Sequence, residues 1–352
     1  MKPPFSFHLP DELCATAPPE VRGINRDQVR MLVIDRQSHA VAHRSFTDLS
    51  DFLHRGDLLV FNSSRTIPAL LSGCDVSSGP CLELRLAERL PDDTWLALLV
   101  CQGADPAAPF SCGIHQGMEL ALGEGLTAEI GERDKRIPRL WRVRFSESGA
   151  KLLDILYRIG SPIRYEYVSA PWSLDYYQNV YAGQPGSAEM PSAGRAFSWQ
   201  LLFDLKRKGI DSTNILLHTG LSSYLDEELD AAHPMSEEAY SISLQASEKI
   251  NTARKNGKRV IAVGTTVVRA LETVADQFGR VSDGSGYTTI RISDQHKLRA
   301  VDGLITGLHE PEASHLDLLT AFLPADVIQS AYEEAIELQY LWHEFGDLNL
   351  IV

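Results

Sequence analysis

The amino-acid sequence predicts an α/β protein in which a small antiparallel β-barrel is inserted into a larger α/β domain. Short buried strands alternate with helical periodicity towards both ends of the chain, whereas the stretch between them carries short alternating runs separated by Gly, Pro and Asp. The 352 residues suffice for two domains, and a hydrophobic content of 44% suits a globular core. We expect residues 1–65 and 148–352 to form the larger, discontinuous domain and residues 66–147 the barrel.

The elements follow in chain order from the periodicity of apolar residues. Residues 29–35 and 57–61 are predicted strands, with a short helix at residues 48–54 between them. Barrel strands are predicted at residues 81–90, 94–101, 118–122 and 140–145. Helices are predicted at residues 150–159, 199–208, 246–256, 266–278, 315–321 and 325–338. Between these helices, strands are predicted at residues 215–218, 259–263, 288–292 and 303–306.

Composition limits the class of protein. No apolar stretch approaches the roughly 20 residues that span a bilayer, and residues 1–5 contain no apolar signal core, so we expect a cytoplasmic protein. The cysteines are odd in number and lack metal-binding spacing, which favours reduced thiols over disulfides or a zinc site. They are Cys14, Cys74, Cys81, Cys101 and Cys112.

The net charge of −14 argues against sequence-blind nucleic-acid binding, which depends on phosphate neutralisation by Lys and Arg. Two local basic runs, at residues 133–144 and 254–259, are candidates for phosphate contacts. For each run a solvated surface is the alternative.

The run at residues 260–272 joins a buried strand to a helix through Gly264-Thr265-Thr266. Such a turn directs backbone N–H groups and hydroxyls towards whatever lies above the strand end, although the same pattern also occurs as a structural connection. Arg269 follows one turn into the helix, where its guanidinium would bind a ligand carboxylate or, alternatively, pair with an Asp or Glu of the chain.

His218 ends a predicted strand and precedes Thr219-Gly220, a place where an α/β domain often has its site; a structural hydrogen bond is the alternative. The segment His309-Glu310-Pro311 superficially resembles a zinc-protease signature. Its second histidine, His315, is too distant along the chain, and Pro311 breaks the helix that would be needed. No metal is therefore predicted.

Further motifs accompany the Gly264 turn in one order over nearly the whole chain. They are Gly56-Asp57-Leu58-Leu59-Val60-Phe61-Asn62, Tyr177-Gln178-Asn179-Val180-Tyr181-Ala182, Pro185-Gly186-Ser187-Ala188 and Phe345-Gly346-Asp347. Together they resemble the S-adenosylmethionine:tRNA ribosyltransferase-isomerase (QueA) family, of which the chain looks like a divergent member. The resemblance implies a three-layer α/β/α domain with an inserted β-barrel, S-adenosylmethionine as substrate without a further cofactor, and a tRNA anticodon base as acceptor.

The implied reaction transfers the ribosyl part of S-adenosylmethionine to the aminomethyl group of a deazaguanine base and rearranges it, releasing adenine and methionine. It needs a general base, a donor for the departing adenine and a pocket that excludes water. Similarity to family segments makes His218, His309, His233 and Glu238 the expected catalytic residues. The expected substrate-binding residues are Gly264, Thr265, Thr266, Arg269, Asp302, Arg65, Tyr177, Arg164 and Arg195. Glu83, on the first long barrel strand, matches an acidic position of the family. For Arg65 and Glu83 an interdomain ion pair is the alternative.

Several loops depart from the family pattern. Charges are gained at Arg164, Glu166, Glu189 and Arg195, and two imidazoles of the pattern are replaced by Ala196 and Ser236. We interpret these changes as a rebuilt site, since a decaying site would lose polar groups. Two alternatives follow: an enzyme that uses S-adenosylmethionine with a different small-molecule or RNA acceptor, and a non-catalytic RNA-binding paralogue.

Overall fold

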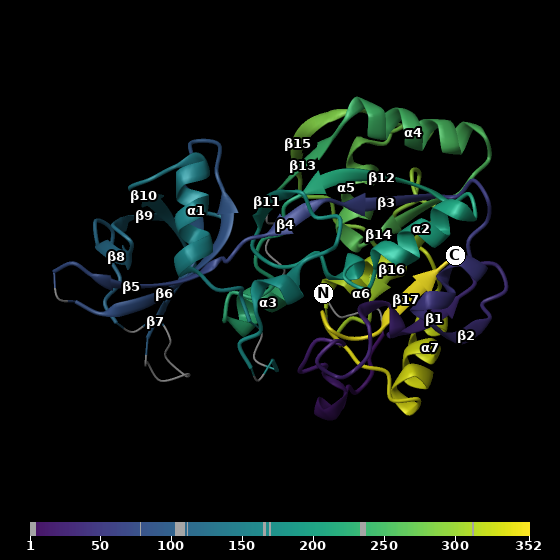
Figure 1. Ribbon diagram of the computed structural model, residues 1–352, viewed down its shortest axis with the longest axis horizontal. Helices are drawn as coiled ribbons and strands as arrows, with labels where there is room; N and C mark the ends of the chain where they lie inside the picture. Colours follow the sequence, from purple (N-terminus) through teal and green to yellow (C-terminus); the bar gives the residue numbers. More distant parts are fainter. Residues whose placement is uncertain are drawn as a thin grey trace.

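The computed structural model describes residues 5–77, 79–102, 110, 112–164, 167–168, 170–232, 237–311 and 313–352. Figure 1 shows a barrel with helix α1 on one side of the molecule and a large sheet flanked by helices on the other. The predicted α/β class with an inserted antiparallel barrel is thus confirmed. Within the described ranges, no helix is long and apolar enough to cross a membrane.

The large sheet is mixed, with a parallel centre. In spatial order its strands are β15 (Gly284–Thr288), β13 (Glu238–Ile242), β12 (Asp211–Leu217), β3 (Leu58–Asn62), β14 (Val260–Val263), β16 (Gly303–Gly307), β17 (Leu348–Ile351), β1 (Arg30–Ile34) and β2 (Val41–Ser45). Strands β12, β3, β14 and β16 run parallel to one another, and β17 runs antiparallel to β16. The carboxyl ends of the four parallel strands therefore lie along one edge of the sheet.

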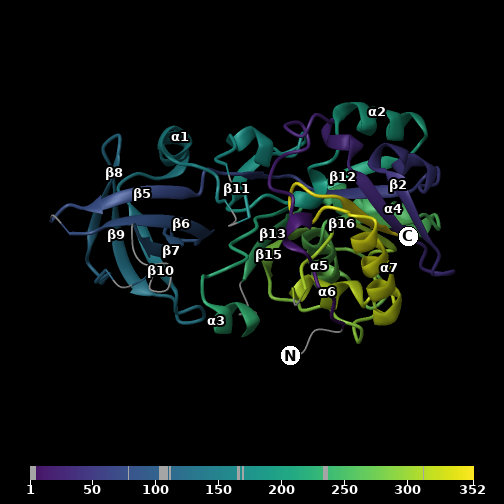
Figure 2. The same cartoon turned by 90° about the horizontal axis from the view of Figure 1, so that it is seen from below.

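Helices cover both faces of this sheet, as Figure 2 shows. Alternate strand residues point to opposite faces, so Leu32 belongs to one core and Met31 to the other. The first core is closed by α4 (Leu244–Lys255), α5 (Thr265–Val274), α6 (Ser314–Leu319) and α7 (Ala325–Glu337). The second is closed by α2 (Trp199–Arg207) and the 3-10 turns η3 (Phe46–Asp51) and η5 (Ser192–Gly194).

The barrel has its own apolar core. Its strands close in the order β10 (Leu140–Phe145), β7 (Trp95–Cys101), β6 (Cys81–Arg89), β5 (Leu70–Asp75), β8 (Glu119–Gly123) and β9 (Leu126–Arg133). Helix α1 (Gly149–Ile159) packs Leu152, Ile155 and Leu156 against that core. Closure leaves no unpaired strand edge, which suits a small insert.

Short elements join the two bodies and complete the fold. The strands β4 (Ser64–Thr66) and β11 (Gln184–Ser187) pair in parallel where the chain passes from β3 to the barrel. The remaining elements are η1 (Asp11–Leu13), η2 (Arg26–Gln28), η4 (Leu174–Tyr177) and α3 (Glu227–Ala232).

Two elements lie at other residues than predicted. The helix expected at residues 48–54 is the 3-10 turn η3, which begins earlier, at Phe46. The strand expected at residues 288–292 lies at Gly284–Thr288 instead, where it pairs with β13. Its Gly284-Ser285-Gly286 start has poor strand propensity, so pairing with a neighbour decides the conformation there.

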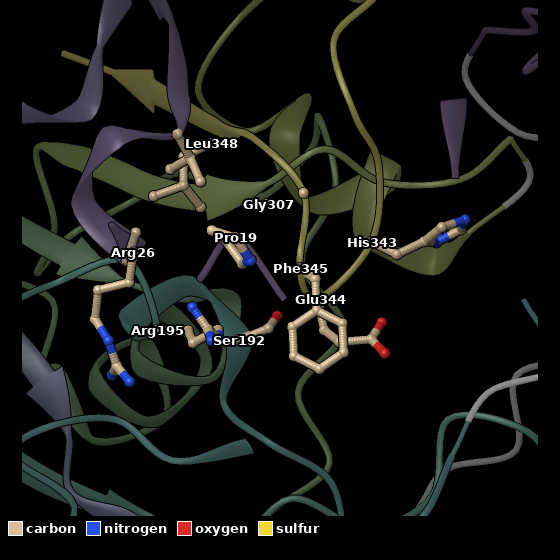
Figure 3. A pocket seen from close by; sticks show the side chains of 12 residues that line it. Pro19, Arg26, Ser192, Arg195, Gly307, His343, Glu344, Phe345 and Leu348 are labelled. Atoms are coloured by element: carbon tan, nitrogen blue, oxygen red, sulfur yellow. The ribbon is translucent and has the colours of Figure 1, made fainter. Parts of the chain in front are cut away.

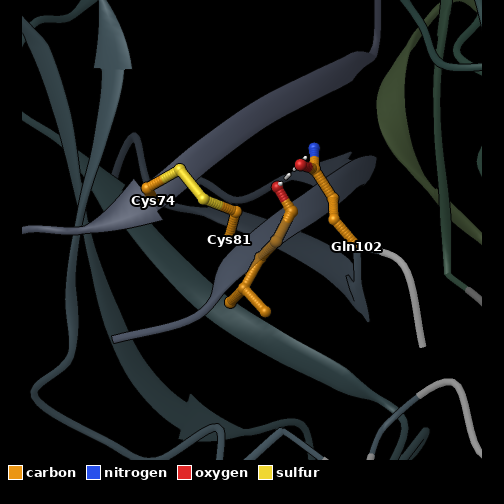
Figure 4. Close-up of a disulfide and its surroundings, with 4 residues drawn as sticks. Cys74, Cys81 and Gln102 are labelled. Carbon is orange, nitrogen blue, oxygen red and sulfur yellow. Dashed lines mark hydrogen bonds between the residues drawn. A yellow bond between two sulfur atoms is a disulfide. The ribbon is translucent and has the colours of Figure 1, made fainter. Parts of the chain in front are cut away.

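The cysteine prediction was wrong. Cys74 and Cys81 form a disulfide between β5 and β6, shown in Figure 4, and Cys101 and Cys112 form a second one. Cys14 is the free thiol of the described chain. The antiparallel register places Cys74 directly opposite Cys81, and a sequence spacing of this kind does not reveal such cross-strand pairing.

Candidate active site

The carboxyl edge of the parallel strands gathers several predicted site residues. His218 follows β12, Gly264 follows β14, and His309 lies just beyond β16. Because β17 runs the other way, its start also lies at this edge, with Leu348 opposite Gly307. This is the edge where open α/β sheets usually bind ligands.

Gly264 makes the sharp turn from β14 into α5. Its φ of +100° lies in the left-handed region, and a Cβ added there would come 3.3 Å from Thr266 Oγ1. The Gly264 N–H donates to the Ile305 carbonyl at 2.8 Å, which fixes the turn against β16. Thr265 is buried and Thr266 half-buried at the start of α5. The helix N-terminus therefore faces the carboxyl edge, where its dipole favours an anionic group.

His218 is held by groups from three segments of the chain. Its Nδ1 lies 2.7 Å from Ser64 Oγ, and its backbone N–H donates to the Ala239 carbonyl at 3.2 Å. Gly186 packs so closely on the ring that an added Cβ would lie 2.4 Å from Cε1. Burial, together with the charge of Arg89, lowers the pKa of His218 below its ordinary value. The imidazole is therefore neutral at pH 7.

His218 opens into a cavity between the barrel and the large sheet, which we call the interdomain cavity. It has a volume of about 740 Å³, including its open mouth. Its walls are Ala87, Glu88, Arg89, Trp95, Ile137, Leu140, Leu153, Pro185, Gly186, His218, Gly220, Leu221, Tyr224, Glu237, Glu238 and Ala239. Apolar and aromatic walls with a few charged groups are typical of a small-molecule or base-binding site.

The barrel contributes an acidic group to this cavity. Burial raises the pKa of Glu88 to about 7, against the opposing effect of Arg136. The Arg136 guanidinium lies 3.6 Å from Glu88 and 2.9 Å from Glu237. The buried Trp95 Nε1 has no hydrogen-bond partner among the described residues.

Glu238 lies on the opposite wall, paired with Arg269. The Arg269 guanidinium donates to the Glu238 carboxylate through Nη1 and to the Ile290 carbonyl at 3.2 Å through Nε. Burial raises the pKa of Glu238, and the charge of Arg269 opposes this. Of the two interpretations of Arg269, the structure has the intramolecular ion pair.

His309 lies near the other end of the same edge. Its Nε2 is 2.9 Å from Thr306 Oγ1, and its ring stacks on His315 with centroids 4.8 Å apart. Burial and the neighbouring His315 lower its pKa well below the ordinary value. His309 is thus a neutral imidazole already engaged by its own loop.

A second, narrower pocket lies beside the start of β17; we call it the C-terminal pocket (Figure 3). Its walls are Pro19, Arg26, Val29, Ser192, Arg195, Ala196, Gly307, His343, Glu344, Phe345, Gly346 and Leu348. Arg195 is only 2% exposed: its Nη2 donates to Glu20 at 2.6 Å and its Nε to the Tyr176 carbonyl at 2.9 Å. Its Nη1 is buried without a partner in the described chain.

Glu344 is a charged group of this pocket that the sequence did not single out, although it directly precedes the Phe345-Gly346-Asp347 motif. Burial raises its pKa to about 7, although the Tyr167 hydroxyl donates to it. Nearby, the buried Tyr177 ring packs on Phe345 with centroids 5.1 Å apart. Burial also raises the pKa of Tyr177 to about 12, and its hydroxyl has no partner within the described ranges.

Asp302 does not reach these pockets. The Val260 N–H donates to Asp302 Oδ2 at 2.8 Å, so this carboxylate lies where β14 begins. Gly264 lies beyond the other end of β14, and a four-residue strand spans about 13 Å. We therefore leave Asp302 out of the proposed site.

The remaining predicted residues are less constrained. Arg65 is half-buried on β4 and forms no ion pair with the described residues, while Glu83 pairs with Arg85 at 2.7 Å. Arg164 is exposed. His233, together with Glu166 and Ser236, lies outside the described residues. Across the described chain, no group of three or more His, Cys, Asp or Glu side chains is placed to hold a metal ion.

Comparisons with known proteins give one consistent family. A family profile described as "Queuosine biosynthesis protein" matches residues 3–351. The S-adenosylmethionine:tRNA ribosyltransferase-isomerase of Heliobacterium modesticaldum is 38% identical over 352 residues, covering 99% of this chain and 98% of that protein. The protein of the same name from Desulforamulus reducens is 34% identical over 360 residues, with the same coverage of 99% and 98%. A crystal structure of S-adenosylmethionine tRNA ribosyltransferase from Thermotoga maritima is 28% identical, covers 99% of this chain and 100% of its own, and superposes with a TM-score of 0.55.

Proposed function

Because this chain belongs to the S-adenosylmethionine:tRNA ribosyltransferase-isomerase family, we propose that its substrates react in the interdomain cavity. The chain is a transferase of queuosine biosynthesis: it moves the ribosyl part of S-adenosylmethionine to tRNA and releases adenine and methionine. One observation carries the location: His218 and Glu238 of the large sheet share a cavity with Glu88 and Trp95 of the barrel. Ring-opened intermediates need such an enclosure, because water would otherwise trap them.

Proton transfer is assigned to His218, Glu88 and Glu238. Burial lowers the pKa of His218 and raises the pKa of both carboxyl groups. Groups in one cavity whose environments shift their pKa values in opposite directions are suited to act as acid and base. Glu88, with a pKa of about 7, is poised to gain or lose a proton at neutral pH.

S-adenosylmethionine, the ribosyl donor, is proposed to lie along the carboxyl edge of the parallel strands. The Gly264-Thr265-Thr266 turn stands between the two pockets, one strand from β16 and two strands from β12. Two strand spacings are about 10 Å, a span that one extended small molecule bridges. We place the adenosine part of S-adenosylmethionine towards His218. Its methionine carboxylate then lies towards the helix N-terminus and the free Nη1 of Arg195, where a charge-assisted hydrogen bond would satisfy that buried donor.

The tRNA is proposed to approach from the barrel side of the cavity. Ile137 and Leu140 line the cavity and belong to the basic run at residues 133–144. Arg65, which has no ion pair in the described chain, and the exposed Arg164 add further positive charge. With a net charge of −14 overall, a local basic surface of this kind must provide the phosphate contacts. Because the substrate is tRNA, we propose a cytoplasmic location.

The test is a product assay. The protein is incubated with S-adenosylmethionine, with and without precursor tRNA, and adenine and methionine are measured by mass spectrometry. His218→Ala and Glu238→Gln should each lower the rate by about 100- to 10,000-fold, as expected for loss of a proton carrier. His54→Ala is the matched control, because His54 is exposed just before β3, at the opposite edge of the sheet.

The outcomes separate the proposal from its alternatives. Adenine release that depends on precursor tRNA supports the proposal. Adenine release without tRNA would instead indicate another acceptor, as the charged departures at Glu189 and Arg195 led us to consider. Salt-dependent tRNA binding without any adenine release would indicate an RNA-binding paralogue. Normal rates in both site variants would remove the interdomain cavity from the reaction.

A further inference from the structure

A pair of buried serines supports His218 from behind. Ser64 and Ser187 are 1% and 0% exposed, and their hydroxyl oxygens are 2.6 Å apart. Ser64 Oγ is also 2.7 Å from His218 Nδ1, and Ser187 Oγ accepts the Thr219 N–H at 3.0 Å. The sequence gives no hint of this chain of contacts, because the two serines are 123 residues apart.

The hydrogens of this chain can be placed by elimination. Among the described residues, the Ser187 hydroxyl has one acceptor for its own hydrogen, which is Ser64 Oγ. Ser64 then accepts from Ser187, so its hydrogen goes to its other partner, His218 Nδ1. A nitrogen that accepts a hydrogen bond carries no proton. The neutral imidazole must therefore carry its proton on Nε2.

The opposite tautomer leaves a buried group unsatisfied. If His218 Nδ1 donated to Ser64, then Ser64 would donate to Ser187. The Ser187 hydrogen would then have no acceptor in the described chain, at a position with 0% exposure. An unpaired buried hydroxyl of this kind shifts the tautomer ratio by about ten- to a hundredfold.

The structure around Ser64 and His218 is rigid enough to maintain the Nε2–H tautomer. The buried Asn62 side chain accepts from the Ser64 and Leu217 N–H groups at 3.1 and 3.0 Å. Its amide also donates to the Leu217 carbonyl at 2.7 Å, so β3 and β12 cannot slide past each other. On another side, the backbone of Gly186 packs directly against the imidazole ring of His218.

We propose that Ser64 and Ser187 are positioning residues that lock His218 in its Nε2–H tautomer, so that a neutral imidazole donates a hydrogen bond into the interdomain cavity. Nδ1 is engaged by Ser64, and Nε2 on the other side of the ring has no hydrogen-bond partner within the described part of the chain. The proposal rests on the proposed function and refines it: His218 donates a hydrogen bond to an acceptor atom of the substrate, and net proton transfer falls to the carboxyl groups of the cavity.

The charges around the ring are mixed. Arg89, Glu88, Glu237 and Glu238 line the same cavity as His218. Burial and Arg89 keep the imidazole neutral. A neutral donor suits the task, because it polarises a substrate atom without adding a second cation beside the sulfonium.

The tautomer can be measured directly. The full-length protein is labelled with ¹⁵N-histidine, and two-bond ¹H–¹⁵N correlations between the ring nitrogens and the protons on the ring carbons are recorded by NMR at pH 7. The signals that are missing in the spectrum of His218→Gln identify His218. The expected spectrum shows a protonated Nε2 and an unprotonated Nδ1. A protonated Nδ1 or an imidazolium in the unmodified protein would overturn the proposal, and this measurement needs no turnover. It therefore stands or fails separately from the product assay.

Variants extend the test to the serines. Ser64→Ala removes the hydroxyl that donates to Nδ1 and should convert His218 to a mixture of both neutral tautomers. The kcat for adenine release should fall about two- to tenfold, in proportion to the lost fraction of the Nε2–H tautomer, while KM for S-adenosylmethionine changes little. Ser63→Ala is the matched control, because the one hydrogen bond of Ser63 Oγ among the described residues is to the Ile215 carbonyl, at 3.1 Å. An unchanged tautomer in Ser64→Ala would contradict the role of Ser64 as the donor to Nδ1. If that variant fails to fold, the spectrum of the unmodified protein still decides.

Discussion

Replacing Arg269 by Met should lower the stability of the protein more than it weakens the binding of S-adenosylmethionine. The Arg269 guanidinium is paired with Glu238, and the two side chains are only 23% and 13% exposed. Removing the guanidinium leaves a carboxylate in a site where burial already raises its pKa. Breaking a buried pair typically costs 3–5 kcal/mol; because about a fifth of Arg269 reaches solvent, we expect about 2–3 kcal/mol.

A double-mutant cycle isolates the pair. Glu238→Gln alone should cost about 1–2 kcal/mol, because a neutral amide keeps one hydrogen bond to the guanidinium. The double variant should be more stable than the sum of the single costs predicts, by about 1–2 kcal/mol, since no unpaired charge remains. Urea unfolding with a common slope m gives these values. Arg158→Met, which breaks the exposed pair with Glu124, is the control and should cost less than about 1 kcal/mol.

One result would refute this reasoning. Arg269→Met could leave the unfolding free energy unchanged and weaken S-adenosylmethionine binding in calorimetry by about 1.5–3 kcal/mol, the scale of a hydrogen bond to a charged group. Arg269 would then bind the methionine carboxylate, and its contact with Glu238 would exist only in the absence of substrate.

Three further outcomes are expected. Asp302→Ala should lower the unfolding free energy by about 1–2 kcal/mol through the lost Val260 hydrogen bond, with adenine release unchanged. The folded-state pKa of Glu344, about 7, lies above its ordinary 4.5; relative to Glu344→Gln, the unmodified protein should therefore lose unfolding free energy as pH rises from 4.5 through 7. Cys81→Ser and Cys112→Ser should cost about 2.5 and 3 kcal/mol in non-reducing buffer, from loops closed by cysteines 7 and 11 residues apart. Full alkylation of all cysteines in unreduced, denatured protein would contradict the disulfides.

The elements that periodicity predicts well are those with one buried face. Residues 303–306 and 325–338, for example, were expected as a strand and a helix and form β16 and α7 within a residue or two at each end. The displaced strand β15 is exposed along most of its length, so it has little apolar pattern to detect. The cross-strand disulfides were missed for a related reason, because they depend on register, which a single strand's sequence does not specify.

The site was predictable where it depends on strand ends. His218 and Gly264 were singled out because each follows a buried strand, and parallel strands bring such positions to one edge. The Ser64–Ser187 contact and the buried carboxyl of Glu344 were not predictable in this way. They depend on segments that are distant in sequence and on burial that only the folded chain produces.

The position of Glu88 could not be predicted from the alternation of inward and outward side chains along its strand. Along β6, Leu82, Leu84 and Leu86 point into the barrel, so strict alternation would place Glu88 inside with them. The register shifts between Leu86 and Glu88, and such a bulge turns the following side chain to the other face. Glu88 therefore lines the interdomain cavity instead of the barrel core, where burial, together with the nearby charge of Glu237, raises its pKa to about 7. Under the proposed function, the barrel therefore contributes a proton carrier to the site and is more than a platform for tRNA.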